Sequence, residues 1–218
     1  SYGDAFLPPT PEKLFAFPLF GSNPDLEPED VRSFELGSRV RRGSFDFDAS
    51  LFWTESDNEI VFDPTPSPSA LFGRNVNAGA TRRRGVDLEA TGRLTESVSA
   101  FAHATLVDAT FRSGPNDGHD VPLVPPLRGA AGIDASLPAG FGLRADVLYV
   151  DEQVLDNDPG NTQVKLAAYT VANLRARWDR RLGPTSASRA GTIGLFVEAA
   201  NLLDETYATR GIYAFDFQ

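Results

Sequence analysis

The sequence predicts an all-β fold, an antiparallel up-and-down meander of about nine strands. Apolar and polar residues alternate with period two along much of the 218-residue chain, whereas helical periodicity is nearly absent. The connections between the alternating segments are alternately tight and long. Residues 45–54 show the alternation most clearly, with Phe45, Phe47, Ala49, Leu51 and Trp53 on one face and Asp46, Asp48, Ser50 and Thr54 on the other.

Two further segments alternate in the same way and complete the pattern. Residues 85–91 place Val86, Leu88 and Ala90 opposite Asp87 and Glu89, and residues 141–149 place Leu143 and Val147 opposite Arg144 and Asp146. In chain order, the predicted strands are 2–6, 31–42, 45–54, 85–91, 97–111, 127–137, 141–149, 168–178 and 191–201.

The loop lengths predict where the connections lie. Tight connections fall at 41–45, 93–97 and 137–141, with a looser one at 179–191, whereas 7–30, 55–80, 112–126 and 151–167 are long and rich in Pro, Gly, Asn and Asp. Every second connection of an up-and-down sheet lies at the same end, so all long loops are expected on one side. Bacterial outer-membrane barrels have this asymmetry, with short periplasmic turns and long extracellular loops.

Aromatic residues are spaced as the two girdles of such a barrel require. Phe45 and Phe141 each follow a tight turn, and Trp53 and Tyr149 come eight residues later on the same faces. Eight residues span ~26 Å along a strand, or ~20 Å of height after tilting, close to the ~25 Å apolar band of membrane barrels. Trp178 would join the lower girdle. The alternative is that these aromatics belong to the core of a soluble sheet.

Composition excludes several classes of function. The formal net charge is −10 and the isoelectric point is near 4.7, which disfavours nucleic acid as a partner because phosphate binding needs a basic face. The chain has no cysteine, so disulfides, thiolate metal sites and cysteine nucleophiles are excluded. No apolar run approaches the ~20 residues of a membrane-spanning helix.

Several segments together resemble TonB-dependent outer-membrane receptors. "GLFVEAANLLDETYATRG" is similar to the penultimate-strand signature of that family, which ends in Asn-Leu-(Phe or Leu)-Asp with a Tyr shortly after. Further segments match in the family's order: "SYGDAFLPPTPEKLF", "NPDLEPEDVRSFELGSR", "RRRGVDLEATGRLTESVSAFAHATLVDATF" and "VPLVPPLRGAAGI". The signature positions in this chain are Asn201, Leu202, Leu203, Asp204 and Tyr207.

The resemblance implies an energy-coupled transporter in the bacterial outer membrane. It would bind a scarce nutrient outside the cell, such as a ferric siderophore or another metal chelate. Membrane lipid would surround the barrel, a plug domain would fill it, and a periplasmic energy-transducing protein would act on the plug. The apolar faces of the strands would contact lipid and the polar faces would line the lumen, which places inside Asp46, Asp48, Ser50, Asp87, Glu89, Arg144 and Asp146. Family barrels have 22 strands, so residues 1–218 are expected to form an open, curved sheet from the C-terminal portion of the barrel, without the plug, the early strands and the last strand.

The expected sites are binding sites, not catalytic ones. Arg74, Arg82 and Arg83 are candidates for binding an anionic ligand at the extracellular mouth through bidentate hydrogen bonds; pairing with neighbouring acidic residues is the alternative. His103 is expected on the inner wall or in packing. The segment "GPNDGHD" at 114–120 matches no calcium-loop spacing, so no metal site and no cofactor are expected.

Two other functions stay open at this point. A passive porin-type barrel would share the strand pattern and the loop asymmetry, and a soluble β-sandwich used for binding would bury the apolar face under a second layer. An enzyme is the least favoured class, because no nucleophile or acid/base pair is arranged for catalysis.

Overall fold

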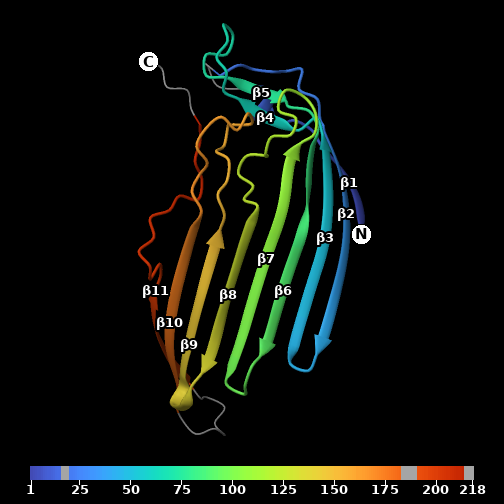
Figure 1. Cartoon of the computed structure of the whole chain (residues 1–218). Helices are drawn as coiled ribbons and strands as arrows, with labels where there is room; N and C mark the ends of the chain where they lie inside the picture. The colour runs from blue at the N-terminus through green and yellow to red at the C-terminus, as the bar shows by residue number, and fades with distance from the viewer. Residues whose placement is uncertain (16–19, 183–190, 214–218) are drawn as a thin grey trace.

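A single nine-stranded antiparallel sheet dominates the structure, a computed structural model that describes residues 1–15, 20–182 and 191–213 (Figure 1). The strands follow one another in the order β1-β2-β3-β6-β7-β8-β9-β10-β11, which confirms the predicted up-and-down meander. Their bounds are β1 Tyr2–Leu7, β2 Glu29–Arg42, β3 Phe45–Asp57, β6 Thr81–Arg93, β7 Val98–Phe111, β8 Leu127–Ser136, β9 Phe141–Val150, β10 Tyr169–Leu182 and β11 Gly191–Ala199.

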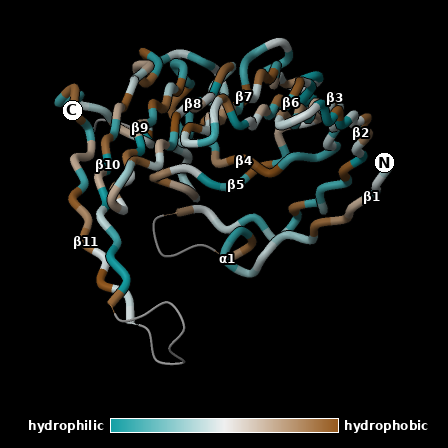
Figure 2. Tube along the Cα trace, turned by 90° about the horizontal axis from the view of Figure 1, so that it is seen from below, coloured by the Kyte–Doolittle hydropathy of each residue, from teal (hydrophilic) through white to brown (hydrophobic). Residues whose placement is uncertain are grey.

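The sheet is strongly curved and open. β1 and β11 lie at its opposite edges, and each pairs with a single neighbour, β2 and β10 respectively. Viewed along the strands, the sheet forms an arc whose two ends stay apart (Figure 2). The prediction of an open, curved sheet is therefore confirmed, and the described strands do not close into a small barrel.

The long connections gather at one end of the sheet, here called the long-loop end, and the tight turns gather at the other, the short-turn end (Figure 1). The tight turns include β2–β3, where Gly43 has a φ of 63°, and β8–β9, where Ala139 and Gly140 have φ of 60° and 83°. Positive φ is the backbone conformation that such reversals require. A short 3-10 helix, Pro138–Gly140, forms the β8–β9 turn.

Two elements at the long-loop end were not predicted. The long connection after β3 contains a hairpin of β4 (Ile60–Asp63) and β5 (Arg74–Asn77), and the connection after β1 contains a helical turn, α1 (Pro11–Leu14). Both strands of the hairpin have four residues, too few for period-two alternation to be recognised. The helical turn has a local signature, with Thr10 as its N-cap and Pro11 at its first position.

The hairpin and α1 lie on the hollow side of the arc and so distinguish the two faces of the sheet (Figure 2). Phe111, at the end of β7, is fully buried against Ala78 after the hairpin and Val121 of the following loop, and it pairs in register with Thr81. Residues that alternate with Phe111 and Thr81 therefore belong to the concave face. A second buried cluster, Val150, Tyr169 and Val171, lies near the same end.

The convex face carries a continuous apolar band. On β2, the charged residues of this face are Asp30 and Arg32 near the long-loop end and Arg42 at the short-turn end, with Phe34, Leu36, Ser38 and Val40 between them. Ten residues at ~3.3 Å, tilted by ~40°, give a band ~25 Å high, the thickness expected for a lipid-facing barrel wall. Register extends this band across the sheet, for example in the row Leu36, Leu51, Val86, Leu106 and Leu127.

No second layer covers this band among the described residues. Phe47, Leu51, Leu88 and Val147 are 50%, 58%, 44% and 39% exposed, although each belongs to the apolar face of its strand. A soluble sandwich would bury this face, so the structure does not support that alternative. In the described part of the chain, no helix has the length and apolar character needed to cross a bilayer.

Candidate functional site

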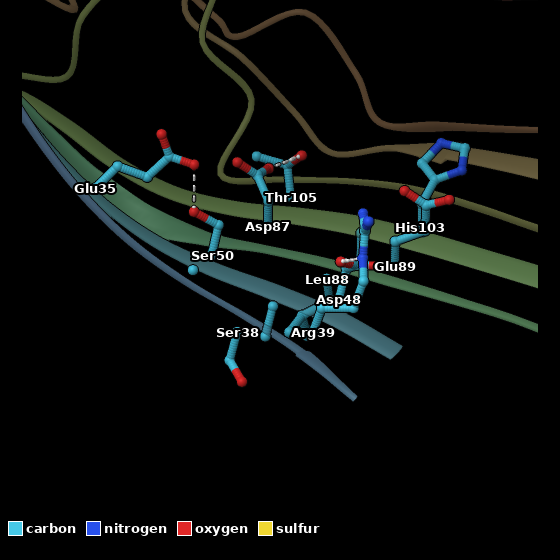
Figure 3. Close-up of a pocket in the computed structure, with 13 residues that line it drawn as sticks. Glu35, Ser38, Arg39, Asp48, Ser50, Asp87, Leu88, Glu89, His103 and Thr105 are labelled. Atoms are coloured by element: carbon cyan, nitrogen blue, oxygen red, sulfur yellow. Dashed lines mark hydrogen bonds and ion pairs between the residues drawn. The ribbon is translucent and has the colours of Figure 1, made fainter. Parts of the chain in front are cut away.

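A polar groove of about 590 Å³ runs along the concave face of β2, β3, β6 and β7 (Figure 3). Alternation along each strand brings its polar residues together, as predicted for Asp48, Ser50, Asp87 and Glu89. Neighbouring strands are antiparallel and in register, so these side chains form rows across the wall. The lining includes Glu35, Arg39, Asp48, Ser50, Asp87, Glu89, His103 and Thr105.

Carboxylates outnumber cations in this groove. Arg39 Nε donates to Asp48 Oδ1 over 2.5 Å. The other two contacts drawn in Figure 3 are made by hydroxyls: Ser50 donates to Glu35 over 2.7 Å, and Thr105 donates to Asp87 over 2.6 Å. The wall is thus polar and net acidic, the opposite of the convex band behind it.

The concave face of β8, β9 and β10 continues the polar wall. Arg144 lies 3.4 Å from both Asp134 and Asp146, and Asn173 donates to Asp146 over 2.9 Å. The guanidinium of Arg144 also lies over the ring of Phe101, 4.8 Å from its centroid. Gly132 leaves room for this ring, because a Cβ at position 132 would lie 2.6 Å from it. The predicted inward positions of Asp46, Arg144 and Asp146 agree with this arrangement.

At the long-loop end, an ion pair fastens the segment before β4 to the wall. Arg83 binds Glu59 in bidentate fashion, with Nη2–Oε1 2.6 Å and Nη1–Oε2 2.9 Å, and the Thr81 hydroxyl also donates to Glu59. The side chains of Arg83 and Glu59 are 29% and 14% exposed, so the pair is largely removed from water. Burial alone would raise the pKa of Glu59, but the hydrogen bonds and charge of Arg83 outweigh it and hold the pKa below its usual value.

Replacing Arg83 with Gln is expected to loosen the β4–β5 hairpin. Glu59 would lose both guanidinium hydrogen bonds while it stays largely buried, at a cost of about 1.5–3 kcal/mol. Hydrogen exchange of residues 58–80 in the full-length protein measures this opening. Arg74→Gln on β5, an arginine without an ion pair to any described residue, is the matched control and should leave the exchange unchanged.

Acid is expected to have the same effect on the native chain. The pKa of Glu59 is lower in the folded state than in the unfolded state, so its stabilisation is complete above the ordinary glutamate pKa of about 4.3 and is lost as the pH falls through the lower folded value. Hairpin exchange should therefore accelerate below about pH 4. An Arg83→Gln variant with the same acid response as the native chain would contradict this assignment.

The three candidate arginines are not brought together. Arg82 and Arg83 are consecutive on β6, so their side chains point to opposite faces of the sheet. Arg82 lies over the Trp53 ring of the convex face, 5.2 Å from its centroid, and Arg84 lies 5.7 Å from the same ring. Arg74 is exposed on β5, opposite Asp63 in register. Binding of an anionic ligand by Arg74, Arg82 and Arg83 stays a prediction.

Side-chain contacts join the loop after β7 to the loop after β9. The Asn161 amide binds the backbone of Asp120 on both sides, accepting from its N–H over 2.8 Å and donating to its carbonyl over 3.0 Å. Lys165 lies 3.3 Å from Asp120 and 3.4 Å from Glu152. Asp156 in turn contacts Arg210 and binds the backbone of Gly211 and Tyr213. The loop after β7, the loop after β9 and residues 210–213 are thus joined by contacts that the sequence did not predict.

The segment with the family signature forms a local turn after β11, and the chain then continues toward the long-loop end. Asn201 and Asp204 have φ of 53° and 51°, a conformation that Asn and Asp tolerate better than most residues. The Asn201 side chain forms two hydrogen bonds with the backbone of Glu205, accepting from its N–H over 3.0 Å and donating to its carbonyl over 2.9 Å. Tyr207 stacks on Tyr169 of β10 with ring centroids 4.5 Å apart. This geometry explains why the strand ends at an Asn, an Asp and a Tyr.

Aromatic side chains mark both ends of the convex band. Phe141 and Trp178 are register partners at the short-turn end, with ring centroids 6.4 Å apart. Tyr2 and Phe34 pack 4.8 Å apart toward the long-loop end, and Trp53 is the register partner of Phe34. The predicted pairs Phe45–Trp53 and Phe141–Tyr149 thus span the band on one face.

The two histidines lie apart from each other. His103 is on the inner wall, in register with Glu89, as predicted, whereas His119 lies in the loop after β7. Within residues 1–15, 20–182 and 191–213, no group of three or more His, Cys, Asp or Glu residues has a geometry that could hold a metal ion.

A family model described as "TonB dependent receptor-like, beta-barrel" matches residues 1–202. The chain belongs to this family. Among curated proteins, this receptor segment is 29% identical over 193 residues to the metal-pseudopaline receptor CntO of Pseudomonas aeruginosa, covering 85% of the chain and 25% of CntO. It is 25% identical over 187 residues to the ferrioxamine receptor of Yersinia enterocolitica, covering 84% and 24%.

Solved structures agree on the fold of the receptor segment. The copper transporter OprC superposes with a TM-score of 0.77 at 19% identity, over 100% of this chain and 34% of OprC. The ferric citrate transporter FecA gives a TM-score of 0.65 at 25% identity, over 86% and 30%. The segment spans about a quarter of the length of the curated relatives named above.

Proposed function

We propose that residues 1–218 are part of the barrel wall of an outer-membrane, energy-coupled receptor that takes up a scarce nutrient as a metal chelate. The family match over residues 1–202 carries this proposal. The relatives support a metal cargo, since their names specify metal-pseudopaline, ferrioxamine, copper and ferric citrate.

The geometry of the sheet fits this role. An apolar convex band about 25 Å high suits contact with membrane lipid, and the acidic concave wall suits a water-filled lumen occupied by a plug domain. The long-loop end, with its connected loops, would face the outside and receive the ligand. The described residues would supply nine adjacent strands of the wall, and the remainder of a larger barrel would pair with the free edges of β1 and β11.

Uptake by the full-length receptor tests the proposal. The receptor would be expressed in a Gram-negative strain that lacks its own metal-chelate receptors, and accumulation of radioactive iron or copper supplied as chelates would be measured. We expect uptake that is lost when the periplasmic energy-transducing protein is deleted or the proton gradient is collapsed. Uptake that persists under both conditions would favour the passive porin-type barrel. Absence of receptor-dependent metal uptake with any chelate would contradict the proposal.

A further inference from the structure

A cavity of about 380 Å³ lies at the long-loop end, between the β4–β5 hairpin and the loops that follow β7 and β9. This volume is within the range of small-molecule sites. The hairpin contributes Asp63, Thr65 and Asn77, and the two loops contribute Asn116, Asn157 and Thr162. Tyr213, which follows β11, also lines the cavity, so four segments far apart in sequence form it.

No Lys, Arg or His is among the described residues that line this cavity, whereas two aspartates are. The Asp63 carboxylate accepts the Thr65 N–H over 2.9 Å and forms no ion pair with a described residue. Asp158 is 3% exposed and accepts hydrogen bonds from Thr162 and Gln163. Asp158 thus shapes the wall, and Asp63 is the carboxylate that stays available to a ligand.

The loops around the cavity add to the negative charge of its two aspartates. Acidic residues outnumber basic ones in each of the long segments 7–30, 55–80, 112–126 and 151–167. Three nearby cations are paired: Lys165 with Asp120 and Glu152, Arg83 with Glu59, and Arg210 with Asp156. Arg74 lies opposite Asp63 in register and has no ion pair with a described residue, but it does not line the cavity. An anion entering the cavity would meet the carboxylates of Asp63 and Asp158, and no cationic side chain is among the described residues that line it.

The cavity also offers neutral hydrogen-bonding groups. The side-chain amides of Asn116 and Asn157 line it, and neither is engaged by another side chain or backbone group in the described part of the chain. An amide both donates and accepts, so it can bind the carbonyl, hydroxyl or amide groups of a chelator. The walls are held in place by the Asn161–Asp120 contacts and by the Glu59–Arg83 pair.

We infer that this cavity binds a neutral or positively charged metal chelate rich in hydrogen-bonding groups, and that it discriminates against anionic chelates. The inference rests on the proposed function and specifies the ligand's charge. It differs from the hypothesis that Arg74, Arg82 and Arg83 bind an anion, because those guanidinium groups do not line the cavity.

Equilibrium binding to the full-length receptor decides between a preference for cationic chelates and a preference for anionic ones. The probes are three ferric complexes: a linear trihydroxamate with a free ammonium group, a neutral cyclic trihydroxamate and an anionic tris-catecholate. We expect the cationic complex to bind at least tenfold more tightly than the anionic one, with the preference increasing as salt is lowered. Equal or tighter binding of the anionic complex, or binding of none of the three, overturns the inference.

Variants assign the preference to the cavity. Asp63→Asn is isosteric and removes one charge, so it should weaken the cationic complex about three- to tenfold and leave the neutral complex unchanged. Asp117→Asn, an exposed aspartate of the loop after β7 that does not line the cavity, is the matched control and should have no effect. Arg74→Ala/Arg82→Ala should not weaken binding of the cationic complex, because neither arginine lines the cavity and their removal takes away only positive charge. An unaltered affinity in Asp63→Asn overturns the inference.

The two proposals can fail separately. Energy-dependent uptake of an anionic chelate would preserve the receptor function and refute the ligand charge inferred for the cavity. Loss of all receptor-dependent metal uptake would refute the function itself.

Discussion

Replacing Leu51 with arginine is expected to destabilise the full-length receptor by about 2–4 kcal/mol, because Leu51 lies near the middle of the convex apolar band. An arginine at position 51 would place its charge near the middle of the hydrocarbon layer, far from both membrane surfaces. Reversible unfolding by urea or guanidinium in lipid vesicles measures the change. Leu88→Arg, one row toward the short-turn end, should have a similar effect.

The neighbouring residue provides the control. Ser50 points into the concave groove beside Glu35 and Asp87, so an arginine at position 50 would be hydrated and would gain opposite charges. Ser50→Arg should therefore cost far less than Leu51→Arg. Equal costs at the two positions would show that the assignment of inner and outer faces is wrong.

Residues 1–218 alone are expected neither to insert stably into a bilayer nor to transport. Within the described residues, β1 and β11 each have one edge without a partner strand, and each unpaired backbone group costs several kcal/mol in hydrocarbon. In water, the same sheet exposes its apolar band and two edges that can pair with other chains. The measurements are flotation with lipid vesicles, protease protection and light scattering after refolding.

The full-length receptor, refolded in parallel, is the control and should float with the vesicles, resist protease and remain dispersed. A protease-resistant, monomeric insertion of residues 1–218 would contradict the prediction, because it would require the two edges to be satisfied within this chain.

The sheet was predictable because each strand has two different environments. In β3, every second side chain faces the apolar side, so the order Phe45, Phe47, Ala49, Leu51, Trp53 fixes both the strand and its faces. Because tight turns join consecutive strands, each strand can pair only with its neighbours in the chain, in antiparallel orientation. The β4–β5 hairpin was missed because a four-residue strand at the loop end has no such alternation.

The candidate site was predicted only where it lies on strands. Asp87 and Glu89 were expected on the inner wall, and the groove contains both. The same period-two rule separates Arg82 from Arg83, so their side chains could not form one cluster. The partner of Arg83, Glu59, and the cavity at Asp63 depend on how a long loop folds back over the wall, which local sequence patterns do not determine.

The contacts of Asn161 with the backbone of Asp120 have a consequence for engineering. Two loops that share such a bridge, together with the Lys165–Asp120 pair, cannot be exchanged independently between related receptors. A chimaera that receives only residues 112–126 from a donor loses the complementary half of the junction, whereas one that receives both 112–126 and 151–167 keeps it. Ligand preference is therefore expected to transfer with the two loops as one cassette.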